Sequence, residues 1–514
     1  MALRRVQFAL LFGLALAWAQ FRGSGQAELA GHLELAIEPR MPARVYLFKD
    51  GQPFRLSPVE ALMPLKIDLF YRERLWHSGK STNTLEVTAN DQSHFFLLKG
   101  GATFDLPAGK YRVEAYRGLF FTPASAEFEL KAGETRRVAL KLENWTGENA
   151  GAWLSGDDHI HLTRAPEDDA VYLGWLEAED LSVGNFLQLQ RQMDAAVQYG
   201  FGPKAEARKP GYSIRSGHES RTDFYGHINL LGGREMVRPL SAGTMYANTA
   251  EAFPYPAMLF AKGRAVGATA GFAHFNGSRA HSTLLMDLAL GNIDFVEVFQ
   301  FGVLKTAEWY ELLNAGLRFT GVAGSDFPVP LNRAKAWPRY IPLLGPERTL
   351  VRPSGSGSPY EMWARGVKEG RVVLTNGPVV EVTVDRANHT ARATARFFRP
   401  IERLDIVVNG EAVASGKGGG VVTATLPGDR SVWVAAHAIG KRESGEPEIQ
   451  GHTNPVYVER AGRLAIVPAA REAVAKRWAA ELDYYRGAAL VFPAGETEKF
   501  LALGEKALAK LREP

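Results

Sequence analysis

The chain has 514 residues, a length that predicts several domains, because single hydrophobic cores rarely grow beyond about 250 residues. Its 60 Lys and Arg residues nearly balance 56 Asp and Glu residues, and no dense basic run stands out, so we expect no nucleic-acid partner. The sequence contains no Cys, which excludes disulfides and thiolate metal sites. Any metal ligands must therefore be His, Asp or Glu.

The N-terminus has the pattern of an export signal. Two arginines precede an almost wholly apolar run over residues 6–18. Ala17 and Ala19 are small residues at the two positions that a signal peptidase reads, which predicts a signal peptide over residues 1–19 and cleavage before Gln20. The apolar run is shorter than the roughly 20 residues of a membrane-spanning helix. We therefore expect a periplasmic or extracellular protein without a stable transmembrane anchor.

Residues 20–148 have the texture of an all-β domain. An alternating strand is predicted to end at Tyr116, and two more alternating runs follow at residues 125–130 and 135–142. The segment 131–134, Lys-Ala-Gly-Glu, has the composition of a turn between them. Short strands with this spacing predict an N-terminal β-sandwich.

In residues 149–378 short apolar strands alternate with helix-length segments, which predicts an α/β domain with a mainly parallel sheet, for which a barrel is one possible form. The predicted strands cover residues 270–274, 295–299 and 321–323, and the predicted helices cover residues 177–199, 282–290, 306–315 and 359–368.

The remaining chain changes texture twice. Residues 379–462 read as strands again, with an Asn409-Gly410 turn signal, and predict a second, smaller β-sandwich. Residues 463–514 are rich in Ala, Glu, Lys and Leu at helical spacing. They predict a helical tail of two helices, broken near residues 492–495.

Histidine is concentrated in one part of the chain, because six of the twelve histidines fall within residues 159–281. Asp157, His159 and His161 alternate along a predicted strand, so their side chains share one face about 6.6 Å apart. Two imidazoles in this arrangement can converge on one divalent ion, and Asp157 can ligate it or orient a histidine. A half-exposed strand with polar residues facing water has the same spacing, so spacing alone leaves both interpretations open.

The segments that follow keep the order of a known set of motifs. Residues 155–162, Ser-Gly-Asp-Asp-His-Ile-His-Leu, resemble the opening Gly-Asp-x-His-x-His of the PHP superfamily of metal-dependent hydrolases. Thr-Asn-Gly-Pro at residues 375–378 resembles the end of this domain in the CehA/McbA group, which includes carbaryl hydrolase. Between them, five segments resemble later motifs of the superfamily: residues 216–219, 225–232, 271–274, 293–298 and 321–326.

This resemblance, over about residues 145–380, implies a multidomain α/β plus β protein with a central (β/α) barrel-type domain that carries a metal centre. Asp157, Arg221 and Asp223 are candidates to orient ligands or contact substrate, although a solvated loop explains the last two equally well. His218 and His281 are better explained as residues outside the centre. The implied metal ligands are His159, His161, Glu219, His227, His274 and Asp326.

Two positions depart from the superfamily's pattern. Phe186 stands near the place where the superfamily often has a Thr-Asp-His ligand, and Pro328 stands where a closing histidine usually follows Asp326. We therefore expect a reduced centre of one or two divalent ions, Zn²⁺, Mn²⁺ or Fe²⁺, instead of a three-metal site.

The ligand set indicates hydrolysis. A divalent ion with an open coordination position lowers the pKa of bound water towards about 7 and polarises the bond under attack. We expect Asp326 and Glu219 to be catalytic, with Asp326 accepting the water proton. The predicted function is an exported hydrolase that cleaves an ester, carbamate, amide or phosphoester bond in a small-molecule or cell-envelope-derived substrate.

The alternative is a degenerate, non-catalytic envelope or carbohydrate-binding protein that retains this scaffold. The two lost ligand positions and the flanking β domains motivate it. The sequence gives no indication of oligomeric state.

Overall fold

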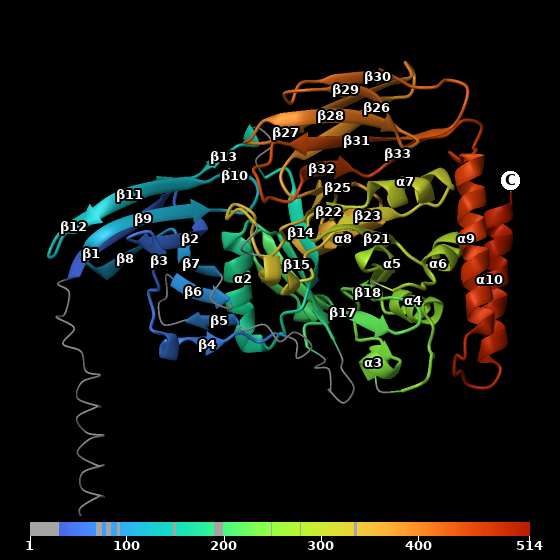
Figure 1. The fold of residues 1–514 in the computed structure, drawn as a ribbon, viewed down its shortest axis with the longest axis horizontal. Coiled ribbons are helices and arrows are strands. Elements are labelled where there is room, and N and C mark those ends of the chain that lie inside the picture. Colours follow the sequence, from blue (N-terminus) through green and yellow to red (C-terminus); the bar gives the residue numbers. More distant parts are fainter. Residues whose placement is uncertain are drawn as a thin grey trace, which may run out of the picture.

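The computed structural model describes residues 30–67, 75–78, 84–89, 93–147, 151–189, 199–247, 249–277, 279–333 and 337–513. The predicted signal peptide, residues 1–19, lies outside the described residues. The fold is rich in β structure, with about 41% of residues in strands and 23% in helices. Figure 1 shows the N-terminal strands at one end of the molecule, the C-terminal strands along the top and two long helices at the opposite end.

The N-terminal region consists of two packed sheets. In the first, β1 (Ala30–Glu38) pairs with β12 (Thr135–Lys141) and β8 (Gly101–Pro107). Alternate residues of these strands, such as Leu33 and Leu35, are buried against the second sheet. The second sheet has the order β11 (Ala124–Leu130), β9 (Gly109–Tyr116), β2 (Pro42–Lys49), β7 (Ser93–Lys99), β6 (Thr84–Ala89), β5 (Leu75–Ser78) and β4 (Met63–Pro64), and β3 (Gln52–Pro53) pairs with β2.

The central region places strands in both directions. Strands β14 (Leu154–Ile160), β15 (Val183–Gln188) and β17 (Tyr212–Thr222) are parallel neighbours. Strand β18 (Ile228–Leu231) is antiparallel to both β17 and β20 (Thr269–Phe272). Strands β20, β21 (Phe295–Gln300) and β23 (Thr320–Ala323) are again parallel. The helices of this region are α2 (Asp169–Ala178), α3 (Thr244–Ala247), α4 (Pro256–Ala265), α5 (His274–Gly277), α6 (Leu284–Leu290), α7 (Thr306–Asn314) and α8 (Pro359–Lys368).

The predicted central (β/α) barrel is wrong, because the described strands form no closed barrel. Residues 223–227 are the whole connection between β17 and β18. A parallel pairing needs a crossover of about a dozen residues or more, so this short turn forces an antiparallel hairpin. Strand β24 (Arg348–Val351) is likewise antiparallel to its neighbours β14 and β25 (Val372–Thr375). The sheet therefore continues through β25 instead of closing on itself.

The helix predicted over residues 177–199 is also wrong in its middle part. Residues 183–188 form β15, in which every residue is buried, and residues 190–198 lie outside the described part of the chain. The strand reads Val-Gly-Asn-Phe-Leu-Gln, and periodicity over six residues does not separate a strand buried on both faces from part of a buried helix. Three other predicted helices are confirmed as α6, α7 and α8.

The C-terminal strands extend the central sheet. Strand β25 pairs with β32 (Ile449–Thr453), and the sheet continues through β31 (Val432–Gly440), β28 (Ile401–Val408), β29 (Glu411–Gly416) and β33 (Val456–Val458). A separate sheet of β26 (Val379–Asp385), β27 (Thr390–Arg396) and β30 (Val422–Thr425) packs against these strands through a shared apolar core. The predicted turn is confirmed: Asn409 and Gly410 both have positive φ, 48° and 87°, and connect β28 to β29.

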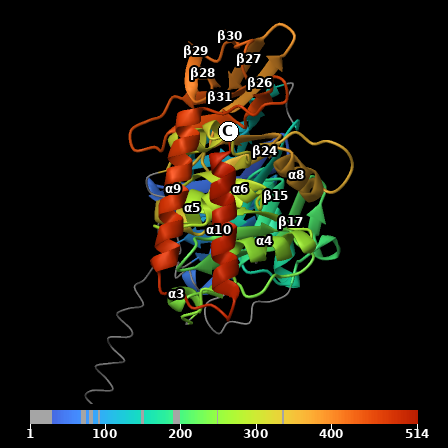
Figure 2. The same ribbon diagram turned by 90° about the vertical axis from the view of Figure 1, so that its right-hand side faces the viewer.

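Two helices, α9 (Pro468–Gly487) and α10 (Glu496–Arg512), close the chain, as predicted, and lie side by side in Figure 2. The Trp478 indole is buried between them and donates to the Gly504 carbonyl over 2.8 Å. Tyr485 of α9 packs on Tyr225 of the central region, with ring centres 5.7 Å apart. The two helices therefore pack against the central region. Among the described residues, no helix is long and apolar enough to cross a membrane.

Helix α2 lies between the N-terminal sheets and the central sheet (Figure 1). A buried ion pair lies next to the end of this helix. Arg44 Nε on β2 donates to Glu179 Oε1, just after α2, over 2.7 Å, and both side chains are at most 1% exposed. Buried Arg348 lies beside Glu179 and donates from Nε to the Gly345 carbonyl over 2.6 Å. The N-terminal region is thus fixed to the central region by charges that water does not reach.

Replacing Arg44 by Ala tests this connection. The change leaves the Glu179 carboxylate buried without its partner, which we expect to lower the free energy of unfolding by about 3–5 kcal/mol. Arg137→Ala is the control, because the Arg137–Glu34 pair is 83% and 42% exposed and is expected to contribute at most about 1 kcal/mol. Urea unfolding curves of the three proteins measure both effects, and equal losses in the two variants contradict the interpretation.

Candidate metal centre

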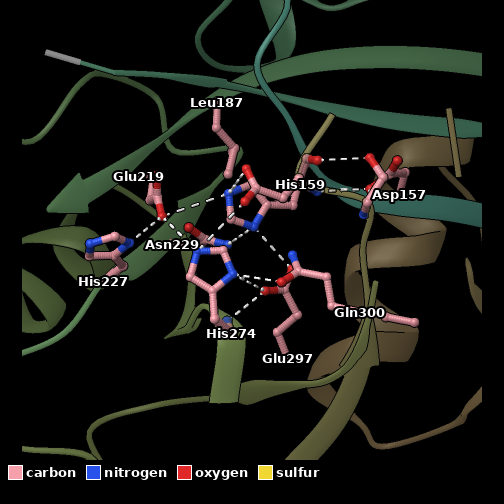
Figure 3. Close-up of polar contacts among 12 residues, drawn as sticks. Asp157, His159, Leu187, Glu219, His227, Asn229, His274, Glu297 and Gln300 are labelled. Carbon is pink, nitrogen blue, oxygen red and sulfur yellow. Dashed lines mark hydrogen bonds and ion pairs between the residues drawn. The ribbon is translucent and has the colours of Figure 1, made fainter. Parts of the chain in front are cut away.

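The six implied ligands come from separate segments that meet at one place. His159 and His161 lie at the end of β14, and Glu219 lies in β17. His227 precedes β18, His274 begins α5 after β20, and Asp326 follows β23. All six side chains are at most 9% exposed, and Figure 3 shows several of them converging.

The nitrogen and oxygen atoms of these side chains lie within a few ångströms of one another. His159 Nε2 is 3.0 Å from His161 Nε2. Asp326 Oδ1 is 3.2 Å from His161 Nε2 and 3.5 Å from His159 Nε2. Glu219 Oε2 is 3.6 Å from His161 Nε2. These four side chains form one half of the cluster.

Glu219 connects this half to a second one. Its Oε1 atom is 3.1 Å from His227 Nδ1 and 3.3 Å from His274 Nε2. The two carboxylate oxygens of one side chain therefore face different histidines. His274 also lies near the first half, with its Nε2 3.9 Å from Asp326 Oδ2.

The hydrogen bonds of the imidazoles indicate which nitrogens are unprotonated. His161 Nδ1 lies 3.1 Å from the Leu187 carbonyl, which can only accept, so this nitrogen carries the proton. His159 Nδ1 lies 3.0 Å from Glu297 Oε1, and His274 Nδ1 lies 2.6 Å from Gln300 Oε1. In the neutral form of each ring, Nε2 then holds a lone pair directed into the cluster.

Electrostatics keeps the carboxyl groups ionised. Burial alone would raise the pKa of Glu219, but Arg221 and His227 outweigh it and hold the pKa well below its usual value. Arg221 Nε donates to Glu219 Oε2 over 2.5 Å. Burial also acts against ionisation of Asp326, yet the neighbouring His159 and His161 lower its pKa. Burial lowers the pKa of His227 to about 4, so this ring is neutral at neutral pH.

The pKa of His159 is shifted in the opposite direction to that of His227. Burial opposes its protonation, but the carboxylates of Glu297 and Asp326 raise its pKa well above the usual value. An imidazole that attracts a proton in this way also attracts a metal ion in place of that proton.

Backbone hydrogen bonds fix the segments that carry the ligands. Asp157 Oδ1 accepts from the amides of His159 (3.0 Å) and Ser325 (2.9 Å), and its Oδ2 accepts from the amide of Gly345 over 2.9 Å. The Phe327 carbonyl accepts from the His161 amide over 2.8 Å. The loop that carries Asp326 is therefore bound to β14 on both sides of its ligand.

The close approach of α5 to the turn before β18 requires a glycine. Gly277 has a φ of 73°, and a Cβ atom there would lie 2.1 Å from the His227 backbone nitrogen. Its carbonyl accepts from the His227 amide over 3.2 Å. A side chain at this position would separate His227 from His274 at the other end of α5.

The other candidates from the sequence lie outside the cluster or at its edge. Asp157 contacts backbone amides instead of a ligand imidazole. Asp223 Oδ2 accepts from the Met245 amide over 3.0 Å and so caps α3. His218 alternates with Glu219 along β17 and points to the opposite face, and His281 pairs with Glu481 at the surface over 3.0 Å. Of the nine candidates, Arg221 is the one outside the ligand set that contacts a ligand side chain.

The two positions that depart from the superfamily pattern carry no metal-binding side chain. Phe186 is fully buried and packs on Tyr172, with ring centres 5.1 Å apart. Pro328 is buried next to Phe327, which belongs to the same apolar cluster as Phe186. Both positions therefore serve core packing.

Several residues around the cluster were missed by the sequence analysis. Glu297 contacts two of the histidines, Asn229 and Gln300 each contact one, and Tyr246 Oη lies 3.1 Å from His227 Nε2. One signal was available for Glu297, because a carboxylate within the apolar strand 295–300 is rarely buried without a partner. The other three give no comparable signal.

Comparison with family models, curated proteins and solved structures found no match to this chain.

The cluster has the chemistry of a cation site. His, Glu and Asp side chains form three overlapping groups whose ligand atoms lie within 4.8 Å of one another, and these buried groups could hold a metal ion. His159 Nε2 and His161 Nε2 face each other across 3.0 Å beside two carboxylates. Two lone pairs at this distance repel each other unless a proton or a metal ion lies between them. Nitrogen and oxygen donors without thiolates suit Zn²⁺, Mn²⁺ and Fe²⁺.

We expect His161→Ala to lose at least one equivalent of bound divalent metal per chain, because the change removes a ligand atom from the first half of the cluster. His281→Ala is the matched control, since His281 lies outside the cluster and is 38% exposed. Elemental analysis of both purified variants beside the unchanged protein measures the difference. Full metal content in His161→Ala would show that the first half is not a metal site.

Proposed function

We propose that this protein is a metal-dependent hydrolase that uses one or two divalent ions. The observation that carries the proposal is the buried convergence of four imidazoles with the carboxylates of Glu219 and Asp326. The ordered motifs that resemble the PHP superfamily, CehA/McbA group, support the same conclusion independently of the geometry.

The residues divide between two positions. His159, His161 and Asp326 would hold one ion, and His227 and His274 would hold a second. Glu219 faces both positions through different oxygens and would bridge them. Zn²⁺, Mn²⁺ and Fe²⁺ are the ions that this donor set favours.

A divalent ion held here supplies a Lewis acid and makes a coordinated water acidic enough to react near neutral pH. Asp326 contributes a carboxylate that is ionised at neutral pH, because its pKa is lowered by the adjacent imidazoles. Its Oδ1 atom faces His161 and His159, whereas its Oδ2 atom lies 3.9 Å from His274 Nε2, and we assign to Oδ2 the acceptance of the water proton. Arg221 keeps Glu219 in its orientation through the 2.5 Å hydrogen bond.

The substrate class follows from this chemistry. The chemistry that such an ion would supply suits carbonyl and phosphoryl centres, so the proposed reaction is cleavage of an ester, carbamate, amide or phosphoester. The export signal predicted from the sequence supports a periplasmic or extracellular substrate, either a small molecule or a component of the cell envelope.

A binding protein without catalysis is the second candidate, and one observation favours it. A groove of about 1,040 Å³ lies over β29 and β30 and is lined in part by Arg430, Arg460 and Arg463. None of the six cluster residues lines this groove. A ligand there would be bound independently of the metal centre.

A panel of chromogenic aryl esters, carbamates, amides and phosphodiesters tests the proposed function. We expect turnover by the metal-loaded protein, loss of turnover with a chelator and recovery with Zn²⁺, Mn²⁺ or Fe²⁺. Asp326→Asn should lower kcat/KM by about 10³-fold, on the order of 4 kcal/mol of transition-state stabilisation.

Asp223→Asn is the matched control for this change, because Asp223 caps α3 and touches none of the cluster residues. It should retain turnover within about threefold, which is less than 1 kcal/mol. Stoichiometric metal without turnover of any substrate in the panel would contradict the hydrolase and support the binding protein.

A further inference from the structure

Glu297 is a buried carboxylate on β21 that belongs to none of the three ligand groups and yet contacts two of their histidines. It is 1% exposed. Figure 3 shows it beside His274 and His159, on the side of these rings away from Glu219. The six residues of its strand are all buried, and Glu297 is the acidic one among them.

Both oxygens of Glu297 are engaged, each with a different segment. Oε1 lies 3.0 Å from His159 Nδ1 at the end of β14. Oε2 accepts from the His274 backbone amide over 2.7 Å and lies 3.4 Å from His274 Nδ1. One side chain therefore spans two ligand histidines that are far apart in the sequence.

These contacts decide which nitrogen of each ring faces the cluster. A carboxylate can only accept, so Glu297 favours a proton on His159 Nδ1. On His274 Nδ1 it reinforces the proton that the 2.6 Å hydrogen bond to Gln300 Oε1 already favours. Nε2 of both rings is left as the ligand atom. The rings of His159 and His274 stack with centres 5.1 Å apart and an angle of 23° between their planes. Glu297 thus aligns two Nε2 atoms that belong to different halves of the cluster.

Glu297 also holds the backbone of His274. This residue has a φ of 51°, a left-handed conformation that costs free energy for a residue other than glycine. The 2.7 Å bond from its amide to Glu297 Oε2 stabilises that conformation. The direction in which His274 leaves β20 therefore depends on the same carboxylate that orients its ring.

We propose that Glu297 is the positioning residue of the metal centre, which directs His159 Nε2 and His274 Nε2 towards the bound ions and couples its two halves. This inference rests on the proposed metal centre, but not on hydrolysis. Glu297 itself contacts no substrate in this account. A packing role alone predicts no change in the coordination of a bound metal.

Glu297→Gln tests the proposal with two measurements on the full chain. Competition titration of Zn²⁺ or Mn²⁺ against a chelator should show a Kd weaker by about 10–100-fold, the usual effect of removing such a partner. With Co²⁺ bound, the visible absorption spectrum should change, because two ligand rings are no longer held.

Asp294→Asn is the matched control, three positions earlier in the chain. Asp294 Oδ2 accepts from the Ala270 amide over 2.9 Å, a contact much like that of Glu297 with His274, but it touches no ligand histidine. Its metal affinity should equal that of the unchanged protein. Gln300→Ala removes a contact with His274 alone and should weaken metal binding less than Glu297→Gln does.

The outcomes separate the possibilities. An unchanged Kd in Glu297→Gln overturns the proposal and leaves a packing role. If Glu297→Gln does not fold, Glu297→Asp replaces it: the shorter carboxylate keeps the charge but cannot span both rings, so the Kd must again weaken. Absence of metal in the unchanged protein overturns the metal centre and this proposal together. Metal binding without turnover overturns the hydrolase alone.

Discussion

The structure depends on a cluster of ionisable side chains that is almost inaccessible to water. Four imidazoles and the carboxylates of Glu219 and Asp326 meet where each side chain is at most 9% exposed. Buried carboxylates and facing imidazole lone pairs are unfavourable unless a cation compensates them. The surrounding contacts, from the backbone bonds of Asp157 to the 2.5 Å bond between Arg221 and Glu219, maintain this arrangement. The divalent ion that we propose for this cluster would compensate these charges.

The rest of the fold positions this centre. The carboxyl ends of β14, β20 and β23 bring His161, His274 and Asp326 to one place, and the hairpin of β17 and β18 adds Glu219 and His227. Asp157 links the end of β14 to Gly345, and Gly345 accepts a hydrogen bond from Arg348, beside the Arg44–Glu179 pair. Contacts with the N-terminal sheets therefore reach the loop next to the ligands.

The sequence predicted which residues converge at the candidate site better than it predicted the architecture. The alternation of His159 and His161 and the ordered motifs after them single out six residues that the structure brings together, because short motifs carry local geometry with them. The prediction of a barrel was wrong, because the direction of β18 depends on the five-residue connection 223–227. The periodicity of strands and helices does not reveal that direction. The roles of Glu297, Gln300 and Asn229 depend on contacts across strands, and no spacing within the sequence reveals them.

The most direct test of the account is a crystal structure of the purified protein with anomalous scattering measured at the absorption edges of Zn, Mn and Fe. The account predicts one or two anomalous peaks among His159, His161, Glu219, His227, His274 and Asp326, with Glu219 in contact with both ions where two are bound. An ordered site with no anomalous peak between these side chains, in protein supplied with the three metals, would contradict it.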